Sequence, residues 1–150
     1  MKVLFIDFDG VLCSDRYVRE NQNEDGVLLD PSKMEILKEI IDRTGAEIVL
    51  STSWRGHWSK TEDGLDATGR QMNEIFASYG LKIFDKTPKL NIERAGEIKL
   101  WLDENKVEAF AVLDDMFLDA PYLRGHFVKV ASFRALDSEN AEETVKILNA

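Results

Sequence analysis

The stretch KVLFIDFDGVL at residues 2–12 predicts the fold of this chain. Residues 3–6 form an apolar run of strand length that ends abruptly in the sequence DFDG. A strand that is apolar on both faces belongs in the middle of a sheet covered by helices. Because ligands bind at the carboxyl ends of strands in open α/β sheets, Asp7 and Asp9 indicate a site there. A simple Asp-Gly turn with an incidental second aspartate is the alternative interpretation.

The composition predicts one domain over residues 1–150. A chain of this length with 44% hydrophobic residues can bury a core of its own. The net charge of −9 disfavours tight nonspecific binding of nucleic acid, but it leaves room for a local basic patch that holds one phosphate. The chain opens directly on a strand and has no apolar run of membrane-spanning length. We therefore expect a cytoplasmic protein without membrane contact.

Short apolar runs alternate with helical patterns along the whole chain. We expect strands at residues 3–6, 46–50, 81–84, 109–113 and 127–130. We expect helices at residues 31–44, 70–79, 92–105 and 138–148. Polar loops are expected over residues 14–30, as a flap above the site, and over residues 56–69. This alternation predicts an α/β fold with a Rossmann-like parallel sheet, right-handed crossovers and helices on both faces.

Polar residues follow three of these strands and are expected to meet at one sheet edge. Asp7 and Asp9 follow the first strand, Ser51 follows the second, and Asp114 and Asp115 follow the fourth. At about 4 Å and an effective dielectric near 20, each pair of carboxylates repels by roughly 4 kcal/mol. Such a cluster needs a cation or a shared proton. All-oxygen ligands favour Mg²⁺, which keeps open positions for substrate oxygens.

Three segments resemble the motifs of the haloacid dehalogenase (HAD) superfamily of Mg²⁺-dependent phosphohydrolases. FIDFDGVL at residues 5–12 resembles the first motif, IVLSTS at 48–53 the second, and AVLDD at 111–115 the fourth. The motifs come in the same order as in the family, each on its own predicted strand, and span essentially the whole chain. The resemblance implies a HAD-like fold and hydrolysis of a phosphomonoester.

The resemblance also implies roles for the carboxylates. Asp7 would attack the phosphorus and become an aspartyl phosphate. Asp9 would protonate the leaving oxygen as a general acid and then activate water as a general base. Asp7, the backbone carbonyl of Asp9, Asp114 and Asp115 would hold Mg²⁺. An aspartate at the second position is typical of the family's phosphatases.

The phosphate itself needs donors and a positive charge. By resemblance, Ser51 and Thr52 would hydrogen-bond its oxygens, and a basic residue of the third motif would neutralise it. Lys86, Lys89 and Arg94 all qualify for that role by position. We favour Arg94, because it lies in the first turn of a predicted helix, and keep Lys89 as the alternative.

A narrower resemblance concerns the segments SDRY at residues 14–17, STSWR at 51–55, ERAGEIKLWL at 93–102 and VLDD at 112–115. Together they are similar to small phosphatase modules of nucleic-acid repair proteins, akin to the 3′-phosphatase of polynucleotide kinase. This resemblance implies a nucleotide or nucleic-acid end as the substrate. Arg16 and Arg55 would then contact the substrate, and Trp54 would stack on a base, with plain packing as the alternative role for Trp54.

The insertion points for a cap domain are short. The loops at residues 14–30 and 56–69 are too small to fold on their own, so we expect a minimal cap or none. An open site suits a phosphate on a large molecule, or else it needs a partner subunit as its lid. The sequence leaves the oligomeric state open.

Two other functions remain open. Clustered aspartates with Mg²⁺ also serve metal-dependent nucleases or phosphodiesterases. A phospho-accepting signalling domain combines similar residues, but there the acid pair follows the first strand, whereas Asp114 and Asp115 come late in this chain. The order therefore disfavours the signalling function.

Overall fold

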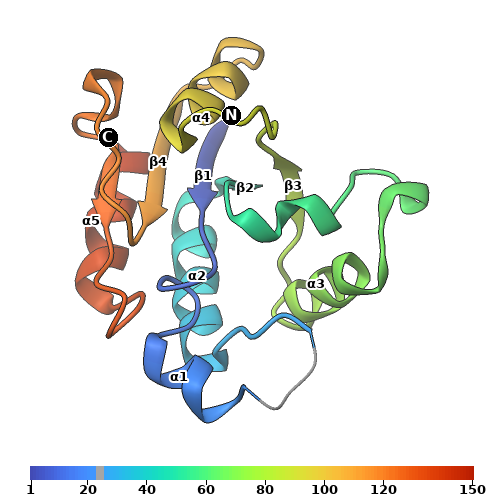
Figure 1. The fold of residues 1–150 in the computed structure, drawn as a ribbon. Coiled ribbons are helices and arrows are strands. Elements are labelled where there is room, and N and C mark those ends of the chain that lie inside the picture. Colours follow the sequence, from blue (N-terminus) through green and yellow to red (C-terminus); the bar gives the residue numbers. More distant parts are fainter. Residues whose placement is uncertain (23–25) are drawn as a thin grey trace.

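The computed structural model describes residues 1–22 and 26–150, which form a five-stranded parallel sheet (Figure 1). The strands are β1 (Lys2–Ile6), β2 (Glu47–Leu50), β3 (Ile83–Lys86), β4 (Ala109–Asp114) and β5 (Phe127–Lys129). Their order is β3-β2-β1-β4-β5, and each neighbouring pair is parallel. The first strand therefore lies at the centre, which confirms the Rossmann-like arrangement expected from the sequence.

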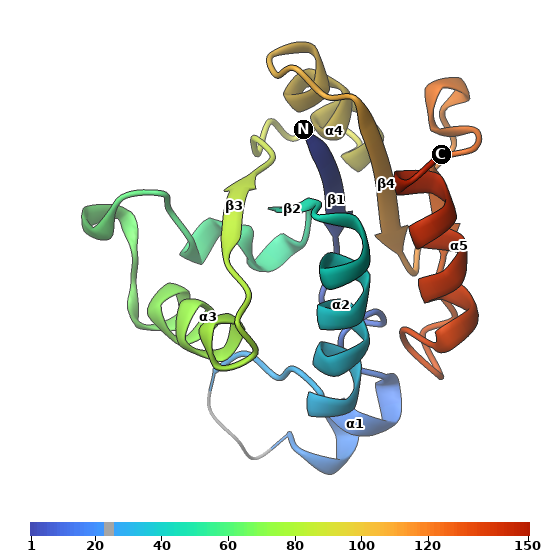
Figure 2. The same ribbon diagram turned by 180° about the vertical axis from the view of Figure 1, so that it is seen from behind.

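Helices cover both faces of this sheet, as Figures 1 and 2 show. They are α2 (Pro31–Thr44), α3 (Ala67–Ser78), α4 (Arg94–Asp103) and α5 (Ser138–Leu148). A short helix, α1 (Asp15–Glu20), buries none of its residues and covers neither face. Leu4 and Ile6 of β1 point into a core shared with α2, α3 and α5, whereas Val3 and Phe5 point into a second core with α4. This alternation of side chains between two apolar layers explains why β1 is apolar at every position from Val3 to Ile6.

Helix caps mark two of the predicted helices accurately. Asp30 accepts a hydrogen bond from the backbone of Ser32 before α2, and Gly45 ends that helix with a φ of 70°. Asp137 forms a capping box with Asn140 before α5. Both helices begin and end where the sequence predicts, because the caps are readable in one dimension.

Other boundaries differ from the prediction. The expected loop over residues 14–30 contains α1, and residues 23–25 of it lie outside the described part of the chain. Helix α3 begins at Ala67 instead of residue 70, because Asp66 caps it through the backbone N–H of Gly69. Strand β3 lies two residues later than predicted, α4 is shorter at both ends, and β5 ends one residue earlier.

A buried ion pair fixes α4 to the segment after β2, where Ser53–His57 form a short 3-10 helix, η1. Arg55 of η1 lies 2.8 Å from Glu97 of α4, and each side chain is only 7% exposed. The Arg55 guanidinium also donates to the carbonyl oxygens of Thr52, Thr87 and Pro88. Three segments that meet at the carboxyl edge of the sheet are therefore held together from within.

Among the described residues, no helix combines the length and the apolar character that crossing a membrane requires.

We predict that Glu97→Ala lowers the free energy of unfolding by about 3–5 kcal/mol, because it leaves the buried Arg55 without its counter-charge. Urea denaturation of both proteins measures the loss. Glu20→Ala is the control, since it removes an exposed ion pair with Arg16 and should cost less than about 1 kcal/mol. Equal losses in the two variants would contradict the prediction.

Candidate active site

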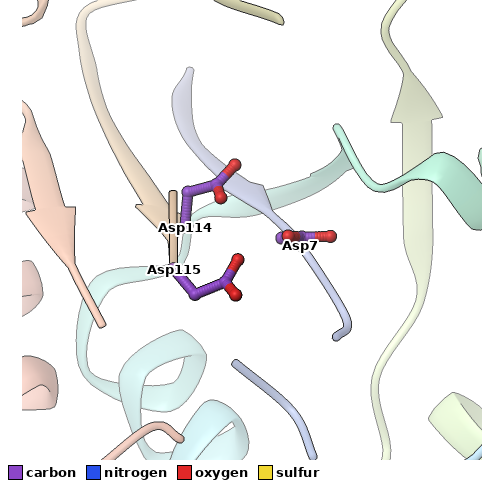
Figure 3. A group of neighbouring side chains, drawn as sticks. All are labelled: Asp7, Asp114 and Asp115. Atoms are coloured by element: carbon purple, nitrogen blue, oxygen red, sulfur yellow. The ribbon is translucent and has the colours of Figure 1, made fainter. Parts of the chain in front are cut away.

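Three carboxyl groups meet at the carboxyl edge of the sheet, on two neighbouring strands. Asp7 directly follows β1, Asp114 is the last residue of β4, and Asp115 comes next. Ile6 pairs with Leu113, so the parallel register sets Asp7 beside Asp114. Figure 3 shows the three carboxyl groups grouped between the ends of these strands, and each offers an oxygen within 4.8 Å of the others. The expected convergence of Asp7, Asp114 and Asp115 is therefore present.

Arg94 supplies positive charge to this cluster. Its Nη1 lies 2.6 Å from Oδ2 of Asp114 and 3.0 Å from Oδ2 of Asp7. Arg94 is the first residue of α4, and its side chain is 15% exposed. Helix α4 is anchored by the Arg55–Glu97 pair, and it places the Arg94 guanidinium in the site.

The two lysines considered for the same position lie elsewhere. Lys86 donates from Nζ to the backbone carbonyls of Arg55 and Trp58, at the end of η1. Lys89 is exposed on the loop between β3 and α4. Of the three basic candidates, Arg94 alone has a described contact with the carboxylates.

One positive charge does not balance three buried or half-buried carboxyl groups. Burial raises the pKa of Asp7 to about 7, the charges of Asp114 and Asp115 act in the same direction, and Arg94 opposes them. Burial, followed by the charge of Asp114, also raises the pKa of Asp115. The site therefore favours a proton or an added cation. Its oxygen-only donor set fits Mg²⁺ better than metals that prefer nitrogen or sulfur ligands.

Asp9 lies outside the carboxylate group and is exposed. Its Oδ2 accepts a hydrogen bond from Nε1 of Trp54 at 3.1 Å, and the Sγ atom of Cys13 lies 3.8 Å from its Oδ1. The turn after it is tight, because the N–H of Gly10 donates to the carbonyl oxygen of Cys13. Gly10 has a φ of 79°, and a Cβ there would lie 2.4 Å from Oδ2 of Asp115. Only glycine fits between the two acidic segments.

Ser51 and Thr52, the two hydroxyl residues predicted to bind phosphate, differ in their surroundings. Ser51 is fully buried at the end of β2, and its Oγ has no hydrogen-bond partner among the described residues. A buried hydroxyl without a partner costs free energy, which a ligand oxygen would recover. Thr52 is also buried, but its Oγ1 accepts from the backbone N–H of Trp54 and caps η1. Of the two hydroxyl oxygens, that of Thr52 therefore already has a hydrogen-bond partner, whereas that of Ser51 has none among the described residues.

The residues predicted to contact the substrate are placed in three different ways. Arg16 lies on α1 with a 78% exposed side chain that pairs with Glu20. Arg55 requires a correction, since its guanidinium is buried against Glu97 and backbone carbonyls and cannot reach a substrate in solution. Trp54 is half-buried, packs against the core and bonds Asp9.

Sequence reasoning missed two contacts that shape the site. Glu97 was not recognised as the partner of Arg55, although an acidic residue on the inner face of a predicted helix is a signal for a buried pair. The bond from Trp54 to Asp9 has no counterpart in the sequence pattern, because it joins segments 45 residues apart.

Comparison with known proteins gives one family match. Residues 3–141 match the family described as "HAD domain in Swiss Army Knife RNA repair proteins". No curated protein matches the chain.

We predict that Asp7→Asn stabilises the metal-free protein at high pH. The pKa of Asp7 is about 7 in the folded chain against an ordinary value of 3.8, so the folded state binds this proton more tightly than the unfolded state. The resulting stability is present below about pH 4 and is lost as the pH rises through 7. At pH 8 the variant should therefore exceed the wild type by about 1–4 kcal/mol in free energy of unfolding.

The measurement is urea unfolding in EDTA at pH 4.5 and pH 8. The difference between the two proteins should be several-fold smaller at the lower pH. Asp119→Asn, at an exposed position after β4, controls for the loss of one negative charge. Equal free energies of unfolding for the wild type and Asp7→Asn at pH 8 would contradict the prediction. They would show that burial and the neighbouring carboxylates do not destabilise the ionised form of Asp7.

Proposed function

The chain belongs to the family of HAD domains in Swiss Army Knife RNA repair proteins, and on this basis we propose that it is a Mg²⁺-dependent phosphatase acting through an aspartyl phosphate on Asp7. The observation that carries the proposal is the position of Asp7. Its carboxyl group is buried beside Asp114 and Asp115, and Arg94 contacts it. A nucleophilic carboxylate needs neighbouring positive charge, because it must approach an anionic phosphate.

Asp7, Asp114 and Asp115 would hold the Mg²⁺ ion, together with the backbone carbonyl of Asp9. The fit rests on the donor set, which offers three carboxylates within reach of one another, and on the raised pKa values that mark uncompensated negative charge. Bound there, Mg²⁺ supplies the charge that offsets the carboxylates and the phosphate.

The chain's own residues would carry out two successive steps. In the first, a carboxylate oxygen of Asp7 forms a bond to phosphorus while the ester P–O bond breaks, and Asp9 gives its proton to the leaving oxygen. In the second, Asp9 takes a proton from water, the water oxygen bonds to phosphorus, and the acyl phosphate bond breaks. Inorganic phosphate leaves and Asp7 is regenerated.

Two further side chains would bind the phosphate oxygens. The buried hydroxyl of Ser51 has its donor free among the described residues, and Arg94 presents its guanidinium at the same edge. Both donors are preorganised, Ser51 by strand β2 and Arg94 by the start of α4. Donors fixed before the substrate arrives cost no reorganisation during the reaction.

An RNA or DNA end that carries a phosphate is the substrate class we propose. The family's description as part of RNA repair proteins supports it, and so does the absence of a folded cap among residues 1–22 and 26–150. A site without a cap admits a phosphate attached to a large molecule. With a net charge of −9, binding would depend on local contacts at the site and not on a general basic surface.

We predict that the wild type releases phosphate in the presence of Mg²⁺ and that Asp7→Asn loses more than about 10⁴-fold in kcat, because no carboxylate oxygen remains to form the acyl phosphate. The assay measures phosphate from a panel of 3′- and 5′-phosphorylated oligoribonucleotides, the matching oligodeoxyribonucleotides, nucleotides and sugar phosphates, with Mg²⁺ or EDTA. Asp119→Asn should keep wild-type activity.

The same panel distinguishes the competing functions. An active Asp7→Asn protein would refute the covalent mechanism. Metal-dependent cleavage of internal, unphosphorylated links that persists in that variant would favour a nuclease instead. Preference for sugar phosphates over oligonucleotides would refute the nucleic-acid substrate while leaving the phosphatase chemistry in place.

A further inference from the structure

The edge of the Trp54 indole contacts Asp9, the proposed general acid and base. Nε1 of Trp54 lies 3.1 Å from Oδ2 of Asp9, across 45 positions of sequence. Asp9 itself is exposed and follows the end of β1, so its carboxyl group would otherwise rotate freely. The ring of Trp54 packs against the core on the side of α2, α3 and α5. The indole N–H of Trp54, whose ring is held by the core, thus fixes the exposed carboxyl group of Asp9.

Trp54 is itself held from both sides. Its backbone N–H donates to Oγ1 of Thr52, which caps η1. The next residue, Arg55, is anchored to Glu97. At the far end of η1, Lys86 donates to the carbonyl oxygens of Arg55 and Trp58. Thr52 and Arg55 are predicted from the sequence to bind phosphate or substrate, and Lys86 is one of three candidates for the third-motif cation. In the structure all three support the segment that carries Trp54.

We propose that Trp54 is a positioning residue that holds the carboxyl group of Asp9 in its working orientation through the indole N–H. This inference rests on the proposed phosphatase function and adds a role within the same site. An indole N–H only donates, so it binds an oxygen without a proton. The transferable proton of Asp9 is then carried on Oδ1, because the single proton of the Cys13 thiol has a nearer acceptor in the carbonyl oxygen of Phe8, at 3.6 Å against 3.8 Å for Oδ1. One oxygen is anchored, and the other exchanges protons with the leaving group and with water.

Base stacking, the role expected for Trp54 from the sequence, makes a different prediction. A stacking residue binds the substrate, so its loss raises KM for oligonucleotides. A residue that orients a general acid affects kcat, and most strongly for substrates whose leaving oxygen needs a proton. The two roles therefore differ in which constant changes and in which substrates respond.

The kinetic test compares Trp54→Phe with Trp58→Phe. Each variant keeps an aromatic ring and removes one indole N–H, but Nε1 of Trp58 donates to Asn73 and not to Asp9. In a phosphorylated oligonucleotide end, the leaving group is a sugar hydroxyl oxygen, which leaves poorly without a proton. For this substrate Trp54→Phe should lower kcat about 10-fold or more, since general acid catalysis contributes about 10²–10⁴-fold. For p-nitrophenyl phosphate, a good leaving group, kcat should fall less than about twofold. Trp58→Phe should leave both rates unchanged.

Three kinetic results would overturn the proposal. They are an equal loss for both leaving groups, a rise in KM with kcat unchanged, and wild-type kinetics in Trp54→Phe. The second of these would restore base stacking as the function of Trp54.

A measurement independent of activity tests the contact itself. The chain has three tryptophans, so a ¹H–¹⁵N spectrum contains three indole signals, and Trp54→Phe assigns the one in question. Asp9→Ala should shift the Trp54 signal alone, because Trp58 and Trp101 donate to Asn73 and Asp85. An unmoved Trp54 signal would overturn the proposal whatever the kinetics show. A third outcome combines two results: Asp9→Ala shifts the Trp54 signal, but the wild type has no phosphatase activity. It would show that the contact exists, and it would refute the proposed function and the positioning role with it.

Discussion

The contact of Arg94 with Asp7 and Asp114 is the interaction on which the site depends. Two strand ends bring carboxylates together in a buried place, and without a nearby cation their repulsion would work against the pairing of β1 with β4. Arg94 can lie there only if α4 begins at the right place. The buried pair of Arg55 and Glu97 secures that position from inside the fold. The charge balance of the site therefore depends on where α4 is placed.

The fold was readable from the sequence where one-dimensional signals are strong. The strands at the centre of the sheet are buried on both faces and therefore appear as unbroken apolar runs. Helices α2 and α5 carry caps that mark their ends. The sequence predicts a loop where α1 lies, because α1 buries none of its residues and its sequence therefore lacks apolar periodicity. The boundaries of β3 were misplaced because it is an edge strand, most of whose side chains are only half-buried.

The candidate site was readable only in part, for a related reason. Topology alone brings the ends of β1, β2 and β4 to one edge, so the grouping of Asp7 with Asp114 and Asp115 followed from strand order. The roles of Arg55 and Trp54 depend instead on the direction of single side chains across long sequence separations. An arginine near a motif, such as Arg55, gives the same sequence pattern whether it binds a substrate or pairs with a buried acid such as Glu97. Tertiary packing decides, and the sequence does not display it.

The tight turn after Asp9 limits how this architecture can be enlarged. Gly10 has no room for a side chain beside Asp115, its N–H closes the turn onto Cys13, and residues 10–13 are all buried. A domain grafted between Asp9 and Cys13 would separate groups whose spacing this turn sets. Exposed residues begin again at Asp15, the first residue of α1, and surface positions tolerate insertion better than buried ones. A protein engineer seeking to add a substrate-selecting lid should therefore splice it into α1 or later, leaving the turn intact.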